Sequence, residues 1–138
     1  AAFRAQHAQG LGDRLVGLGE MADAEGAGHC VERGRRKVER FCAHARRFAE
    51  GLNQMEGVRV VNDVVFTQVC VSFGSDEVTR EVAARLLSDG TAWMTPSTWH
   101  GQAVLRISVS NWRTTDDDID RTLDAVRRVL ADVTSAAR

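Results

Sequence analysis

Hydrophobic and polar residues alternate over positions 103–110, and hydrophobic residues recur at steps of three and four over positions 115–133. In the first stretch, Leu105, Ile107 and Val109 fall on one side of an extended chain, whereas Arg106 falls on the other. In the second, the apolar residues at helical spacing are Ile119, Leu123, Val126, Leu130 and Val133. A threonine at 114 or 115, each with an aspartate three residues later, suits the N-cap of this helix. The pattern predicts a strand, a short turn and a helix.

A second helix is predicted over 31–52 and a third over 76–88. The apolar stripe of the 31–52 helix contains Val38, Phe41, Ala45, Phe48 and Leu52. The 76–88 helix has Ser75 as a candidate N-cap and Gly90 as a candidate C-terminal glycine, and its stripe is Val78, Val82, Leu86 and Leu87. These two segments therefore begin or end where capping chemistry predicts.

Three further strands are predicted, over 58–61, 65–73 and 91–99. Asn62 and Asp63 separate the first two by a turn, and Pro96 favours an edge position or a break in the third because proline donates no ladder hydrogen bond. His100 and Gly101 predict a hairpin that returns the chain antiparallel into 103–110. One sheet face would then meet the helices, and the other would carry Gln68, Cys70, Ser72, Arg106, Ser108 and Ser110.

The order helix, strand, strand, helix, strand, strand, helix predicts an α+β domain of two layers, with a mainly antiparallel sheet and its helices on one face. We expect this domain to span 31–138. Residues 1–30 carry repeated glycines and predict a poorly defined N-terminal arm.

Composition narrows the classes of function. A net charge of -1 over 138 residues gives no electrostatic basis for binding nucleic acid, and no apolar run has the length of a membrane span. The cysteines, Cys30, Cys42 and Cys70, are odd in number and lack metal-ligand spacing, which favours reduced thiols in a cytoplasmic protein. We predict no metal site.

The segment 105–126 resembles the end of group II pyridoxal-phosphate-dependent decarboxylases, the family of the glutamate and aromatic amino-acid decarboxylases. It reads Leu-Arg-Ile, then Ser-Asn, a threonine-rich turn and Asp-Asp-Ile-Asp. The similarity covers about 38–130, and the segments 42–52 and 62–73 resemble the bacterial branch. The resemblance implies the C-terminal small domain of a fold-type I enzyme that uses pyridoxal phosphate (PLP), packed on a large domain and assembled as a homodimer.

The same resemblance assigns candidate site residues. Arg106 matches an arginine that, in glutamate-type members, binds the substrate carboxylate, and a guanidinium suits this role because its planar fork stays charged. His100, at the hairpin bend, is a second candidate for the amino-acid substrate, although an exposed turn residue is the simpler interpretation. PLP requires a lysine, and Lys37, the only one, lies in a basic helix outside the family's lysine motif. We therefore expect PLP to be bound mainly by the large domain.

Two hypotheses follow. The chain is either a C-terminal fragment or truncated relative of a PLP-dependent carboxy-lyase, or a stand-alone α+β module that binds a ligand or partner without chemistry. The 105–126 segment favours the first hypothesis, and the lack of a suitable lysine favours the second. A third possibility is that the residues before 31 are read in the wrong frame. Trp93, Trp99 and Trp112 are expected to be buried against the core or a partner.

Overall fold

The structure, a computed structural model, describes residues 24–136. Its helices are α2 (Ala24–Asn53), α3 (Asp76–Asp89) and α4 (Asp116–Ala136), and its strands are β1 (Arg59–Val60), β2 (Gln68–Ser72), β3 (Thr95–Trp99) and β4 (Gln102–Ser108). The order of elements over 31–138 is the predicted one. Helix α2, expected over 31–52, begins earlier, at Ala24, and ends at Asn53.

The chain forms two compact units, residues 1–37 and 38–138. The described part of the first unit is the beginning of α2, where Glu32 pairs with Arg35 at 3.2 Å and with Arg36 at 3.3 Å. The expected N-terminal arm over 1–30 falls mostly outside the described residues, so that domain boundary stays a prediction. No helix within 24–136 is long and apolar enough to cross a membrane.

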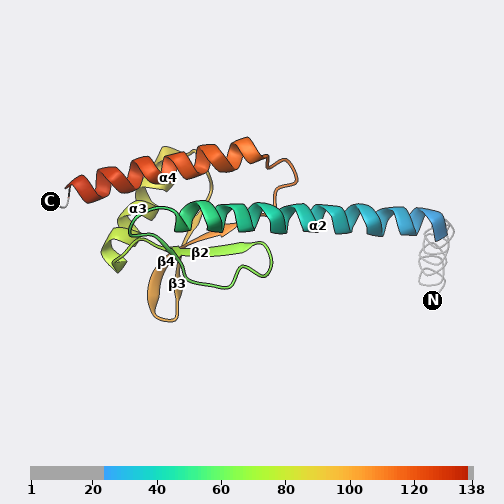
Figure 1. The fold of residues 1–138 in the computed structure, drawn as a ribbon, viewed down its shortest axis with the longest axis horizontal. Helices are drawn as coiled ribbons and strands as arrows, with labels where there is room; N and C mark the ends of the chain where they lie inside the picture. The colour runs from blue at the N-terminus through green and yellow to red at the C-terminus, as the bar shows by residue number, and fades with distance from the viewer. Residues whose placement is uncertain (1–23, 137–138) are drawn as a thin grey trace, which may run out of the picture. The chain divides into compact units, whose positions relative to one another are not determined.

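The second unit is an α+β domain with a four-stranded sheet in the order β1-β2-β4-β3. Every neighbouring pair is antiparallel, and the β3–β4 pairing sets Thr95 opposite Arg106 and Trp99 opposite Gln102. Figure 1 shows the helices on one side of the strands. The predicted fold class and the predicted antiparallel hairpin are confirmed.

The core lies between the helices and one face of the sheet. Its fully buried members include Leu52 from α2, Val71 from β2, Val82 from α3, Leu105 from β4 and Ile119 from α4. Burying such side chains is the main favourable term in folding, worth about 1.5–3 kcal/mol each. The predicted apolar stripes are correct except at their ends. Val38 and Leu87 are 40% and 39% exposed.

Two strands are shorter than their hydrophobic patterns predicted. Residues 65–67 lie outside β2, with Val65 81% exposed and Phe66 58% exposed. The Asn62 side chain accepts from Cys70 N at 2.7 Å and donates to Gln68 O at 3.1 Å, so it closes this loop in place of strand pairing. Residues 91–94 likewise precede β3, which is an edge strand, as Pro96 requires.

Local capping fixes where α3 and α4 begin. Ser75 Oγ accepts from Val78 N at 3.3 Å, and Gly90 ends α3 with φ of 71°. Thr115 and Asp118 form a reciprocal capping box, with Asp118 N to Thr115 Oγ1 at 3.2 Å and Thr115 N to Asp118 Oδ2 at 2.9 Å. Of the two registers that the sequence allowed, the structure uses the one beginning at Thr115.

Helices α2 and α4 approach each other closely at Gly51. A Cβ atom at this position would lie 2.5 Å from Leu123 Cδ1, so any larger residue would require the Leu123 side chain to move. Near this contact Arg47 pairs with Asp116 at 3.1 Å and with Asp120 at 2.8 Å. The first turns of α4, which bound the cavity described below, are therefore held against α2.

Candidate functional site

Arg106 lies at the centre of the sheet, on the face away from the core. The register places it between Cys70 of β2 and Thr95 of β3, so these three residues form a row across the sheet. Its neighbours along β4, Leu105 and Ile107, are buried in the core on the opposite face. The alternation predicted from the sequence is thus present.

The Arg106 side chain forms no ion pair or hydrogen bond with the part of the chain that the structure describes. It is half-buried, its Nε atom is buried without a hydrogen bond, and none of the ion pairs within residues 24–136 includes it. A guanidinium in this state is suited to an anion that comes from outside this chain.

Cys70 is the nearest titratable neighbour of Arg106. Burial raises the pKa of the Cys70 thiol above its ordinary value, and the positive charge of Arg106 partly opposes that rise. Cys70 and Ser72, expected on the sheet face opposite the helices, are both 7% exposed. Their register partners on the neighbouring strands are Arg106 and Arg59. Gln68, Ser108 and Ser110 are exposed as expected.

His100 lies in the two-residue turn between β3 and β4. It is exposed, it has a φ of 47°, and Gly101 follows with a φ of 80°, as in the tight turns that suit hairpins. Its ring packs edge to face against the Trp99 ring, with the two ring centroids 4.9 Å apart. Gln102, beside the turn, is four residues from Arg106, or about 13 Å of strand. The fold does not bring His100 and Arg106 together, and a substrate role for either residue stays a prediction.

The described residues do not suit PLP as their own cofactor. Lys37, the only lysine in the sequence, is exposed on α2 in the first compact unit and lies in a run of arginines. A lysine that bonds to the cofactor needs a lowered pKa and an enclosing site, which an exposed helix face does not supply. No group of three metal-binding side chains occurs within residues 24–136.

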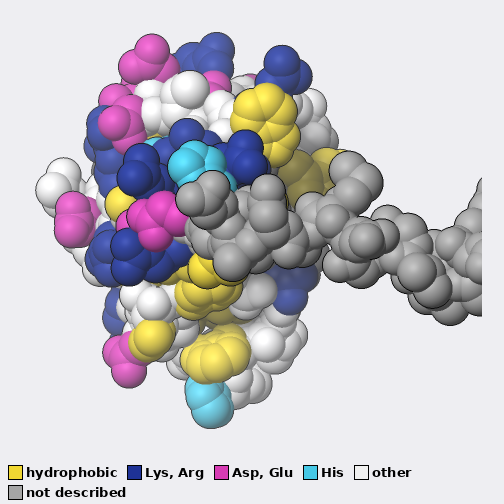
Figure 2. Space-filling model, turned by 90° about the vertical axis from the view of Figure 1, so that its right-hand side faces the viewer, with side chains coloured by type: hydrophobic (Ala, Val, Ile, Leu, Met, Phe, Trp, Pro, Cys, Tyr) yellow, Lys and Arg dark blue, Asp and Glu magenta, His cyan; other side chains and the backbone are white. Residues whose placement is uncertain are grey.

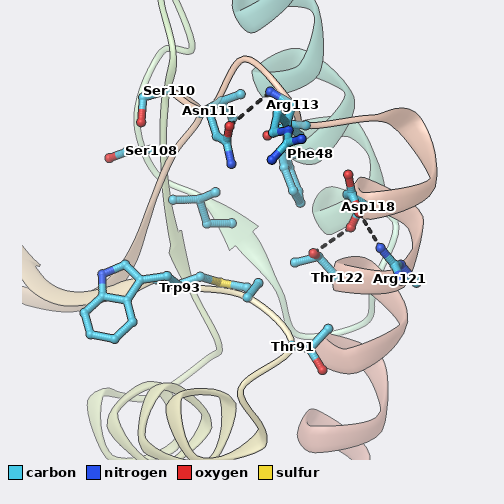
Figure 3. Close-up of a pocket in the computed structure, with 15 residues that line it drawn as sticks. Phe48, Thr91, Trp93, Ser108, Ser110, Asn111, Arg113, Asp118, Arg121 and Thr122 are labelled. Atoms are coloured by element: carbon cyan, nitrogen blue, oxygen red, sulfur yellow. Dashed lines mark hydrogen bonds and ion pairs between the residues drawn. The ribbon is translucent and has the colours of Figure 1, made fainter.

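A cavity of about 440 Å³ opens on the other side of the sheet. Figure 3 shows it enclosed by the 91–94 loop, the end of β4 with the turn that follows, and the first turns of α4. Its wall includes four buried apolar residues: Phe48, Met94, Ile107 and Val109. The sequence did not reveal this cavity, because its walls come from segments up to about 70 residues apart and carry no motif.

The α4 side of the cavity carries a satisfied carboxylate. The pKa of Asp118 falls from 3.8 to about 2, mainly because the Thr115 backbone N–H donates to it, and further because of the Thr115 hydroxyl and Arg121. Thr122 Oγ1 donates to Asp118 O at 2.7 Å. The polar groups of this wall are therefore already paired.

His44 is the most buried histidine within the described residues, at 8% exposure. Its Nε2 lies 3.7 Å from Asp116 Oδ1, and its Nδ1 is buried without a hydrogen bond. In the sequence, His44 has no partner at metal-ligand spacing. The fold places His44 of α2 beside Asp116 of α4, and a structural role between these two helices is sufficient to explain its position.

The tryptophans are surface residues. Trp93, Trp99 and Trp112 are 88%, 42% and 62% exposed, so their expected burial in the core is wrong, and burial against a partner stays a prediction. Figure 2 shows large hydrophobic side chains at the surface among basic and acidic ones. Indole rings that remain exposed in this way are typical of surfaces that meet another molecule.

The fold is shared with PLP-dependent decarboxylases. No protein-family model matches the chain, and no curated protein is similar to it in sequence. Among solved structures, Oryza sativa TDC with PLP superposes with a TM-score of 0.70 at 19% identity, over 74% of this chain and 24% of that one. Catharanthus roseus tryptophan decarboxylase in complex with L-tryptophan superposes with a TM-score of 0.68 at 22% identity. This match covers 71% of the present chain and 22% of the decarboxylase chain.

A bacterial structure is similar as well. The glutamate decarboxylase domain of a diaminobutyrate-pyruvate transaminase and L-2,4-diaminobutyrate decarboxylase from Vibrio parahaemolyticus gives a TM-score of 0.62 at 14% identity, over 70% and 22%. The chain therefore spans less than a quarter of the length of these structures. The likeness confirms the expected resemblance at the level of the fold.

Proposed function

We propose that this chain acts as the small C-terminal domain of a PLP-dependent amino-acid decarboxylase and that Arg106 binds the carboxylate of the substrate. The observation that carries the proposal is the half-buried Arg106, on the sheet face opposite the core, whose buried Nε has no hydrogen-bond partner within residues 24–136. The shared fold with tryptophan and diaminobutyrate decarboxylases supports it. A large domain and the homodimer partner would together supply the residues of the PLP site.

The chemistry of Arg106 in this role is binding and orientation. Its planar guanidinium offers two parallel N–H donors to a carboxylate and stays protonated at any working pH. Since it is already partly desolvated, little further cost arises when a substrate excludes the remaining water. PLP, when bound by the large domain, supplies the electron sink that decarboxylation requires. His100 is proposed as a peripheral contact to the substrate, reached from the hairpin tip.

The test is a full-length decarboxylase that carries this chain as its small domain. Arg106→Leu should lower kcat/KM by about 10²–10³-fold, the cost of removing one partner of a desolvated ion pair. Arg106→Lys should recover part of the loss, because the charge returns without the fork. Arg59→Leu is the matched control, since Arg59 is an exposed arginine whose register with Ser72 puts it on the same sheet face. Unchanged turnover in Arg106→Leu would refute the role of Arg106.

The division of labour between domains has its own test. The 138-residue chain alone, mixed with PLP and treated with borohydride, should acquire no stoichiometric label at Lys37, by mass spectrometry of its peptides. An exposed lysine on an unrelated protein provides the background level. A specific Lys37 adduct that supports decarboxylation would mean that the chain contains its own catalytic site. We also propose that the full-length protein is a cytoplasmic homodimer. Sedimentation of the full-length protein tests the dimer.

A further inference from the structure

The cavity between the 91–94 loop, the end of β4 and α4 is a second place where a ligand fits, separate from the Arg106 face. Ile107 and Val109 line it from the core side of β4, whereas Arg106 projects from the opposite face. At about 440 Å³ it is within the size range of small-molecule sites, about 300–1,000 Å³. Ser108 and Ser110, from the other side of the same segment, also line the cavity, whereas Arg106 does not. The cavity is therefore a separate site at the end of β4.

The polar groups of the cavity differ between its β4 side and its α4 side. On the β4 side, the side-chain donors of Ser108, Ser110, Asn111 and Arg113 have no hydrogen-bond acceptor within residues 24–136. On the α4 side, Asp118 already accepts from Thr115 and Arg121. The two serine hydroxyls and the Asn111 amide can donate or accept, whereas the guanidinium of Arg113 can only donate, so Arg113 favours a ligand that carries acceptors.

The net charge of the cavity wall also favours a ligand with acceptors, and in particular an anion. Two arginines, Arg113 and Arg121, and one aspartate, Asp118, line the cavity, so its wall carries one net positive charge. Asp118 and Arg121 form an ion pair with each other, which leaves Arg113 as the unpaired charge. A monoanion is the ligand that this arrangement balances.

The turn that presents Arg113 is held in place before any ligand binds. Asn111 Oδ1 accepts from Arg113 N at 3.0 Å, and Thr114 N donates to Asn111 O at 3.1 Å. The guanidinium lies 5.3 Å from the Trp112 ring, and Arg40 donates to the Trp112 carbonyl. Such preorganisation lowers the entropy cost of binding.

The rest of the cavity wall is apolar or aromatic. Phe48, Met94 and Ile107 line the cavity and are otherwise buried, with exposed fractions of 6%, 3% and 5%. Trp93 lies at the rim with 88% exposure, and Figure 3 shows its indole on the side away from α4. An apolar or aromatic body would pack against these groups.

We propose that this cavity binds a small carboxylic acid with an aromatic or branched apolar body, with its carboxylate held by Arg113 and Asn111. This site is independent of the proposed role of Arg106. It would let the domain sense an acid other than the substrate that Arg106 binds.

The experiment titrates the full ¹⁵N-labelled chain with phenylacetate and follows the backbone amide signals. Saturable shifts should cluster in 91–94, 108–113 and 118–122. Phenethylamine, which has the same ring and the opposite charge, should produce no such shifts. Arg113→Gln should weaken binding ~tenfold or more, the loss expected of a charged bidentate contact, and Arg113→Lys should recover part of it.

Two controls keep the test decisive. Arg59→Gln removes an exposed positive charge from another part of the sheet and should leave the affinity unchanged. Arg113 is exposed, so its substitution removes no core packing, and the spectrum of each free variant reports its fold. Shifts that never saturate, shifts centred on Cys70 and Arg106, an equal response to phenethylamine, or an unchanged affinity in Arg113→Gln would each overturn the proposal.

Discussion

The two faces of the sheet are built from alternate residues of the same strands, yet they differ in almost every property. On the helix side, Val69, Val71 and Leu105 are fully buried among apolar neighbours. On the other side, the same two strands place a thiol and a guanidinium, Cys70 and Arg106, next to each other. One face is complete within this chain, and the other carries a buried donor that the chain does not satisfy.

The difference shows how stability and binding are divided in this domain. Apolar burial on one face supplies the free energy of folding, and that surplus allows the domain to keep an unpaired donor on the other. Substitutions on the helix face should therefore affect stability, and substitutions on the Arg106 face should affect binding. Four measurements test this division, from the largest effect to the smallest.

Leu105→Ala should have the largest effect on stability. Leu105 is fully buried at the centre of the sheet, so its truncation leaves a cavity and should lower the free energy of unfolding by about 2–5 kcal/mol. Urea unfolding followed by circular dichroism measures the change. Ser108→Ala, three residues on and exposed on the other face, is the control and should stay within about 0.5 kcal/mol. Equal losses in both variants would contradict the division.

Acid should weaken the helix layer through the cap of α4. Folding lowers the pKa of Asp118 from 3.8 to about 2, so its carboxylate stabilises the fold above about pH 4, and this contribution is lost as the pH falls toward 2. Asp118→Asn should be less stable than the wild type at pH 6, and the gap should narrow by pH 2. The urea midpoints of unfolding of both proteins, at pH 6 and at pH 2, measure this difference in stability. A gap independent of pH would show that the charge of Asp118 does not matter.

Arg106→Leu should change the stability of the chain by no more than about 0.5 kcal/mol, as at an ordinary surface site. The guanidinium has no ion pair to lose within the described residues, and its unpaired Nε is removed by the substitution. The same urea experiment tests this prediction. A large loss of stability would mean that Arg106 is part of the fold rather than of a binding surface.

The smallest effect concerns the reactivity of Cys70. Burial raises the pKa of its thiol and Arg106 lowers it, so Arg106→Leu should raise that pKa further and reduce the thiolate fraction at pH 9. Alkylation by iodoacetamide, read by mass spectrometry, should then be slower at Cys70. Exposed Cys30 is the internal reference and should react at the same rate in both proteins. Faster alkylation of Cys70 in the variant would contradict the proximity of the two side chains.

Some features of the site were accessible from the sequence and others were not. Arg106 was found because a charge interrupts an alternating strand and matches a family pattern. The cavity was missed because Phe48, Met94 and Arg113 belong to no common motif and meet only after folding. The tryptophans were misjudged because residue type predicts average burial, whereas actual burial depends on what covers each position.

The sequence by itself determined the element types and their order, because helix and strand periodicities and caps such as Ser75 and Thr115 are local properties. It also determined which face of β4 carries Arg106, since strand alternation leaves only one choice.

Tertiary structure alone decided how far each pattern extends. Val65 and Phe66 have the side chains of a strand, yet they lie exposed within the loop that the Asn62 side chain closes. Tertiary structure also decided that Arg106 lies beside Cys70 and that Arg113 faces a cavity. These outcomes depend on contacts between residues distant in the chain, whose energies no local pattern contains.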